Sequence, residues 1–222
     1  MFKKQIPVSR KIVKDLFSLY SHLNFKVRLY LRIRWLLTPF ETVEKYVPKQ
    51  GLILDLGSGY GIFSNLLNIL SDNRSVIGID LSEQRTKIAQ LTVGDRYNIR
   101  FLKGDLKTVE LSPCDVITLY AVLHHMNYKA QEDLLNQCAE KLKQKGILII
   151  KDNDTRPYWK YLLNYVHELA VMYLLGVKGD RLSFRTPEDF KSLLIKIGFS
   201  IDTIRLKTYL PYPFILYICK KR

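Results

Sequence analysis

Cysteine, tryptophan and acidic residues are all scarce in this chain of 222 residues. The three cysteines, Cys114, Cys138 and Cys219, are too few and too scattered for a disulfide framework. We therefore expect them to be small buried side chains in a reducing compartment. No Cys-x-x-Cys pair and no His-x-x-x-His spacing occurs, so the sequence predicts no metal site.

Long apolar runs are also missing. The N-terminus is basic but has no uninterrupted apolar stretch, which indicates neither a secretory signal nor a membrane-spanning helix. We accordingly expect a cytoplasmic location, with peripheral attachment to a membrane as the alternative.

Positive charge is abundant and unevenly placed. The chain has 35 Lys and Arg against 21 Asp and Glu, a net charge of +14. Residues 1–35 carry nine basic residues and one acid, Asp15, and so hold +8 of that excess. Such a segment favours contact with something anionic. Three interpretations stay open: a helical cover over a ligand site, docking on an anionic membrane surface, or RNA binding, the last without a separate RNA-binding module in its support.

Hydrophobic periodicity divides the chain near residue 48. Residues 1–48 read as a basic helical extension, with apolar residues at helical spacing from Ser9 to about Tyr46. Residues 49–222 read as one α/β domain. The expected strands are 52–56, 75–80, 99–103, 115–120, 146–151, 199–207 and 213–220, and the expected helices between the first five are 61–70, 82–93 and 129–144.

Apolar strands separated by helices indicate a doubly wound, mostly parallel sheet covered on both faces. The last two strands are joined too closely for a crossover, so they should pair antiparallel. Ser82 and Pro187 are good helix-start residues, and Gly146 and Gly198 are expected helix stops. The helical, aromatic stretch at about 152–186 reads as a lid inserted after the fifth strand.

A glycine-rich turn follows the first expected strand. Asp55 ends that strand, and Gly57, Gly59 and Gly61 follow at alternate positions. Glycines allow a sharp turn and a close approach of backbone to ligand. In an open α/β sheet, ligands bind at this carboxyl edge of the strands.

Two further carboxylates end the next strands. Asp80 lies 25 residues after Asp55, where it could accept both hydroxyls of a ribose, and Asp105 lies where it could accept from an adenine amino group. A dinucleotide-binding site fits less well, because its fingerprint is Gly-x-Gly-x-x-Gly and Ile62 occupies the place of the third glycine.

These motifs resemble the class I S-adenosylmethionine-dependent methyltransferases, in particular the small-molecule type with Leu-His-His after the fourth strand. The resemblance covers residues 50–150 and implies a seven-stranded sheet whose last strand is antiparallel. It also implies S-adenosylmethionine as cofactor and S-adenosylhomocysteine as product. The cofactor-binding residues that it implies are Asp55, Gly57, Ser58, Gly59, Gly61, Asp80, Leu81, Gly104, Asp105, Leu106, Tyr120 and Ala121.

The acceptor side is less specified. His124 and His125 follow the fourth strand at the productive edge and are candidate catalytic residues or acceptor ligands. Candidate acceptor-binding residues lie in and after the lid segment: Asp152, Arg156, Tyr158, Trp159, Arg181 and Arg185.

The apolar lid favours a small or lipid-like acceptor. We expect methyl transfer to an oxygen of that acceptor by direct in-line displacement. The alternatives are an RNA methyltransferase that uses the basic N-terminal face and a non-catalytic cofactor-binding accessory protein.

Overall fold

A seven-stranded sheet organises the computed structural model, which describes residues 8–175, 182–206 and 212–221. The strand order is β3-β2-β1-β4-β5-β7-β6. The strands are β1 (Gly51–Leu56), β2 (Arg74–Asp80), β3 (Ile99–Lys103), β4 (Cys114–Tyr120), β5 (Leu142–Asn153), β6 (Phe199–Leu206) and β7 (Phe214–Lys221). Strands β1 to β5 pair in parallel, whereas β7 is antiparallel to both β5 and β6. The predicted fold class is confirmed.

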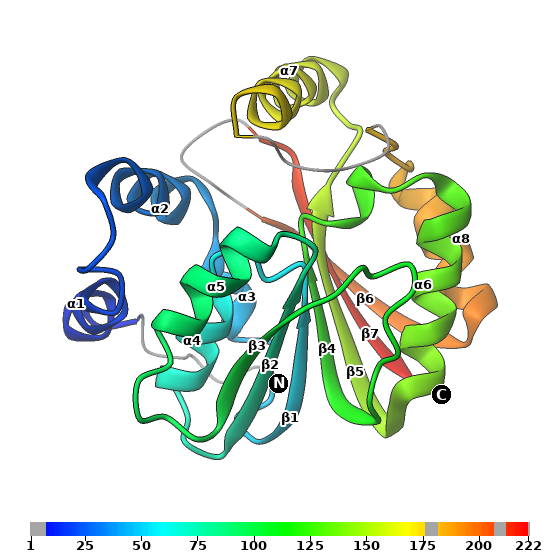
Figure 1. Ribbon diagram of the computed structural model, residues 1–222. Coiled ribbons are helices and arrows are strands. Elements are labelled where there is room, and N and C mark those ends of the chain that lie inside the picture. The colour runs from blue at the N-terminus through cyan, green and yellow to red at the C-terminus, as the bar shows by residue number, and fades with distance from the viewer. Residues whose placement is uncertain (1–7, 176–181, 207–211, 222) are drawn as a thin grey trace.

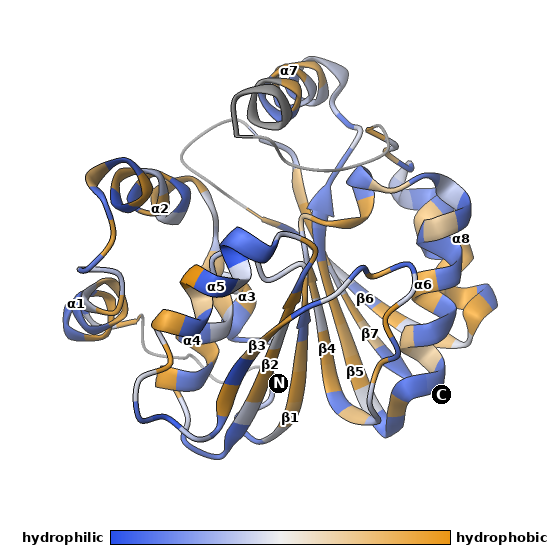
Figure 2. Cartoon of the chain, in the orientation of Figure 1, coloured by the Kyte–Doolittle hydropathy of each residue, from blue (hydrophilic) through white to orange (hydrophobic). Residues whose placement is uncertain are grey.

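Helices cover both faces of this sheet (Figure 1). They are α1 (Arg10–Ser18), α2 (Phe25–Leu37), α3 (Phe40–Glu44), α4 (Ile62–Ile69), α5 (Glu83–Leu91), α6 (Tyr128–Lys141), α7 (Tyr158–Leu175) and α8 (Pro187–Ile197), with a short 3₁₀ turn η1 (Leu123–His125). In Figure 1, α4 and α5 lie on one side of the sheet and α6 and α8 on the other, while α7 crosses above its upper edge. The strands between these layers are predominantly hydrophobic in Figure 2, as a buried parallel sheet requires.

The N-terminal helices pack into the main core. Leu16 and Tyr20 of the first helical segment and Leu31 of α2 are buried in the cluster that contains Phe63 and Leu66 of α4. The phenol of Tyr20 donates to the carbonyl of Tyr60, in the turn before α4. The expected boundary near residue 48 thus falls between α3 and β1 in the chain, but one hydrophobic cluster spans it.

Most expected helix ends agree with the structure. The Ser82 hydroxyl caps α5 by accepting from the amide of Arg85, Pro187 begins α8, and Gly198 ends α8 with a φ of 110°. The prediction that Gly146 ends a helix was wrong. Helix α6 ends at Lys141, and β5 already begins at Leu142, so Gly146 lies inside the strand. The three cysteines are free and buried, as expected.

One carboxylate joins the centre of the sheet to α4. Asp55 is 1% exposed, and its two oxygens accept hydrogen bonds from the hydroxyls of Thr118, on β4 at 2.7 Å, and Ser64, on α4 at 2.5 Å. Burial raises the pKa of Asp55 to about 6, although both hydroxyls favour the charged form. The Asp55 side chain therefore links β1 to β4 and to α4, and its role is structural.

The raised pKa of Asp55 makes stability depend on pH. Because the folded-state pKa lies above the unfolded value of 3.8, this group's contribution is complete below pH 4 and is lost as pH rises through about 6. Relative to Asp55→Asn, the wild type should lose about 3 kcal/mol of unfolding free energy between pH 4 and pH 7. Urea unfolding at several pH values measures this difference. The exposed Asp95→Asn is the control, and a pH-independent difference for Asp55→Asn would contradict the assignment.

Candidate cofactor and acceptor site

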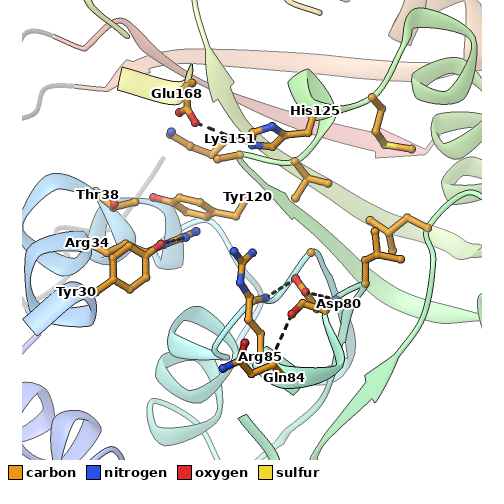
Figure 3. Close-up of a pocket in the computed structure, with 18 of the residues that line it drawn as sticks. Tyr30, Arg34, Thr38, Asp80, Gln84, Arg85, Tyr120, His125, Lys151 and Glu168 are labelled. Carbon is orange, nitrogen blue, oxygen red and sulfur yellow. Dashed lines mark hydrogen bonds and ion pairs between the residues drawn. The ribbon is translucent and has the colours of Figure 1, made fainter. Parts of the chain in front are cut away.

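A cavity of about 850 Å³ opens at the carboxyl edge of the parallel strands. Its lower part is formed by the loops after β1, β2 and β3, and its upper part by α2, η1, β5 and α7 (Figure 3). The cavity therefore has two ends of different chemistry, one at the glycine turn and one beneath α7.

The glycine turn forms the floor of the first end. Gly57 and Gly61 both have a φ of +76°, which side chains with a Cβ rarely adopt. A Cβ at Gly57 would lie 2.3 Å from Val122, and one at Gly61 would lie 2.5 Å from the ring of Phe101. The amides of Gly57 and Ser58 donate to the carbonyl of Ile79. The turn is thus held against β2 by backbone bonds in a space that admits no side chain.

Asp80 links the loops that follow β1 and β2. One carboxylate oxygen accepts from the Gly59 amide at 2.8 Å, and the other accepts from the Ser82 amide at 2.9 Å. The residue lines the cavity, as Figure 3 shows. An anionic acceptor of hydrogen bonds is therefore fixed at the edge of the cavity before any ligand binds.

The predicted cofactor residues divide into those that line the cavity and those behind it. Lining residues are Gly57, Gly59, Asp80, Leu81, Asp105, Leu106, Tyr120 and Ala121. Asp55, Ser58, Gly61 and Gly104 do not line it and instead build the turns that carry the lining residues. Asp105 accepts from the amide of Lys107 at 3.0 Å, which fixes the turn after β3.

The two histidines have different surroundings. His125 lines the cavity, whereas His124 is 1% exposed and lies behind it. Nδ1 of His124 contacts the Asp152 carboxylate at 2.5 Å, and its Nε2 lies 3.7 Å from the Glu168 carboxylate of α7. Burial opposes the imidazolium of His124, but the carboxylate of Asp152 outweighs it and raises the pKa to about 9. Burial lowers the pKa of His125 to about 4.

Several lining residues were not predicted from the sequence. Lys151 lies near the carboxyl end of β5 and is 3% exposed, and its ammonium is 3.3 Å from the ring centroid of Phe214. Burial lowers the pKa of Lys151 to about 8. Glu168 of α7 and the pair Tyr30 and Arg34 of α2 also reach the cavity (Figure 3). The sequence could have indicated Lys151, because it lies near the end of an expected strand. The positions of Glu168, Tyr30 and Arg34 depend on how their helices pack, which the sequence does not give.

Five of the predicted acceptor-binding residues are described by the structure, and they lie outside the main cavity. Asp152 is buried against His124, and Arg185 bonds Gln131 and Glu132 of α6. Arg156 pairs with Glu188 at 3.5 Å on the surface. Tyr158 and Trp159 are exposed at the start of α7. Arg181 lies outside the described residues.

Removing the charge of Asp80 tests the lower end of the cavity. Asp80→Asn keeps the size of the side chain but weakens its acceptance from ligand hydroxyls, so we expect about 10- to 100-fold lower affinity for S-adenosylmethionine. Isothermal titration calorimetry measures the affinity, with Asp95→Asn as the exposed control. Unchanged affinity in a folded Asp80→Asn protein would count against a cofactor site here.

Part of the chain is similar in sequence to known methyltransferases and related proteins. Residues 53–146 match the family model described as "Methyltransferase domain". YqeM of Bacillus subtilis, which is named as a methyltransferase, is 24% identical over 73% of this chain and 78% of its own. A carboxy-S-adenosyl-L-methionine synthase of Helicobacter pylori is 33% identical over 48% of this chain, which spans 44% of that relative.

Solved structures share the fold. An O-methyltransferase family 2 protein from Planctomyces limnophilus, in complex with apigenin, has a TM-score of 0.67 and 20% identity, and covers 87% of this chain and 60% of its own. Human N-acetylserotonin methyltransferase, in complex with S-adenosylmethionine, has a TM-score of 0.66 and 20% identity, and covers 96% of this chain and 57% of its own. Residues 53–146 thus resemble a methyltransferase domain, and the solved structures share the fold of this chain.

Proposed function

We propose that this protein transfers the methyl group of S-adenosylmethionine to an oxygen of a small or lipid-like acceptor. The observation that carries the proposal is the two-ended cavity, in which the glycine turn adjoins a second compartment walled by α2 and α7. Methyl transfer requires both ligands at once in one water-poor space, because proximity and alignment supply much of the rate.

The first end is assigned to the cofactor. Asp80 would accept from the ribose hydroxyls, Asp105 and Leu106 would flank the adenine, and the turn around Gly57 and Gly59 would lie beneath the methionine part. These roles agree with the chemistry of the donors, since carboxylates accept hydroxyl and amino protons and a Cβ-free turn leaves room for a ligand.

The second end is assigned to the acceptor. Ile33 and Leu37 of α2 supply apolar wall, while His125 and Glu168 supply polar groups close to Tyr120. The bound cofactor supplies an electrophilic methyl group on a sulfonium. An acceptor oxygen in line with that methyl carbon would form the new C–O bond as the C–S bond breaks and its electrons pass to sulfur, and the hydroxyl proton would pass to solvent water.

The histidines have separate proposed roles. His125 faces the compartment and is assigned to contact the acceptor oxygen. His124 does not line the cavity and is assigned a positioning role, because Asp152 fixes its Nδ1 and its other nitrogen points toward Glu168. The structure from Planctomyces limnophilus named above is of an O-methyltransferase family 2 protein in complex with apigenin. Its similar fold supports oxygen as the acceptor atom in the proposal for this chain.

The outer faces of the two wall helices favour a lipid-like acceptor met at a membrane surface. On α2, Phe25, Leu29 and Leu36 are exposed apolar residues outside the cavity lining, and Lys26, Arg28 and Arg32 accompany them. On α7, exposed apolar residues recur on the described part of the helix at Tyr158, Trp159, Leu162, Leu163, Val166 and Leu169. Apolar residues flanked by basic ones suit an anionic interface. No helix among the described residues is long and apolar enough to cross a bilayer.

An isotope-tracing experiment tests the proposed reaction. Purified protein, S-adenosylmethionine with a deuterated methyl group and cell extract are incubated together, and mass spectrometry searches the polar metabolites, the lipids and the digested RNA. We expect the label on oxygen of a metabolite or lipid, with Asp80→Asn as the control that lowers it. Label in RNA nucleosides would favour the RNA alternative, and no enzyme-dependent label in any fraction would favour a non-catalytic protein.

Vesicle binding tests the outer surface. The double variant Phe25→Ser/Leu36→Ser removes two exposed apolar side chains of α2, so we expect about tenfold weaker binding to phosphatidylglycerol vesicles. The matched control, Leu91→Ser/Tyr97→Ser, alters exposed residues in and after α5 and should bind as the wild type does. Sedimentation with vesicles measures binding. Equal losses in both variants, or tighter binding to RNA than to vesicles, would contradict the proposal.

A further inference from the structure

We propose that His124, His125 and Glu168 form a site for a divalent transition-metal ion at the acceptor end of the cavity. This inference rests on the proposed function, in which the same end binds the acceptor oxygen. It also reverses the expectation from sequence that the chain has no metal site. The three side chains each offer a ligand atom, and these atoms lie within 4.8 Å of one another.

The ligand types and the geometry suit such an ion. Two imidazoles and one carboxylate are a common set for zinc, iron and cobalt, with open positions left for an exogenous oxygen. The Glu168 carboxylate lies 3.7 Å from Nε2 of His124 and 4.0 Å from Nε2 of His125 (Figure 3 draws the second contact). Bonds of about 2.0–2.2 Å would place such atoms roughly 3.0–3.5 Å apart. The two glutamate–histidine distances would then shorten by several tenths of an ångström, and no pair of ligand atoms starts more than 4.8 Å apart.

An unpartnered buried nitrogen is the independent observation. Nε2 of His124 is buried without a hydrogen-bond partner in this structure, although His124 is only 1% exposed. Burying a polar atom without a partner is costly, and such atoms in a native protein call for an explanation. Meanwhile Nδ1 of the same ring is held by Asp152, the arrangement by which a carboxylate orients a metal-binding histidine.

The location gives the ion a role. His125 and Glu168 line the main cavity, and a cation between them would bind the acceptor oxygen beside Tyr120 and Ala121. A metal-bound hydroxyl loses its proton to solvent more readily. The resulting oxyanion would then attack the methyl carbon, and the C–S electron pair would pass to sulfur. The substrate class that fits is therefore an acceptor with a hydroxyl able to coordinate a metal.

Cobalt binding to the metal-free protein tests the site directly. Protein treated with chelator and then titrated with Co²⁺ should take up about one ion per chain and show visible absorption typical of four- or five-coordinate cobalt. Glu168→Gln and His125→Ala should lose this absorption. Asp152→Asn should weaken Co²⁺ binding by about 10- to 100-fold, because it loosens the orientation of His124.

Matched controls separate a lost site from a lost fold. His22→Asn removes an exposed histidine and should leave the cobalt spectrum unchanged. Each site variant should keep its affinity for S-adenosylmethionine, which binds at the other end. A wild-type-like spectrum in Glu168→Gln, or no Co²⁺ binding by the folded wild type, would overturn the metal site. Methyl transfer that continues undiminished after chelation would overturn the catalytic role of the metal ion and leave the proposed methyl transfer standing. Cobalt binding without any methyl transfer would overturn the proposed function and leave the metal site standing.

Discussion

The turn between β1 and α4 depends on the absence of side chains. Val122, after β4, and Phe101, on β3, already fill the places that a Cβ at Gly57 or Gly61 would need. The backbone can therefore lie against β2, where the Ile79 carbonyl accepts two of its amides. Because the turn is fixed this closely, the Gly59 amide reaches the Asp80 carboxylate, and this contact helps to form the cavity floor.

A second constraint is electrostatic and lies at the opposite end of the cavity. His124 stands between the carboxylates of Asp152, on β5, and Glu168, on α7. Those carboxylates raise the pKa of the imidazole to about 9, and the histidines in turn lower the pKa of Glu168 to about 2 despite its burial. Buried charged groups stabilise the fold only when they are paired, so α7 and β5 are linked through the ring of His124. A metal ion would occupy the position toward which these groups converge.

The wall helices connect the inside of the cavity to the outer surface. Helix α2 places Tyr30 and Arg34 toward the cavity, and Phe25 and Leu36 are left exposed. The phenol of Tyr30 accepts from Arg34 at 3.1 Å, which keeps this arginine directed along the wall. The same helix therefore lines the compartment proposed for the acceptor and presents a basic, partly apolar face, so the proposed acceptor choice and the proposed surface attachment would both depend on one element.

The sequence by itself determined the approximate positions of the first five strands, the glycine turn and the carboxylates at the strand ends, because these depend on local patterns and on backbone conformation. It also determined the antiparallel terminal pair, since a short connection excludes a crossover. The end of α6 was misplaced at Gly146, because a glycine in a strand and a glycine after a helix look alike without the neighbouring strand. Tertiary structure alone decided that Glu168, 43 residues after His125, reaches the histidines. Helix periodicity gives the faces of α7 but not its rotation over the sheet, and burial of side chains from distant segments fixes that rotation.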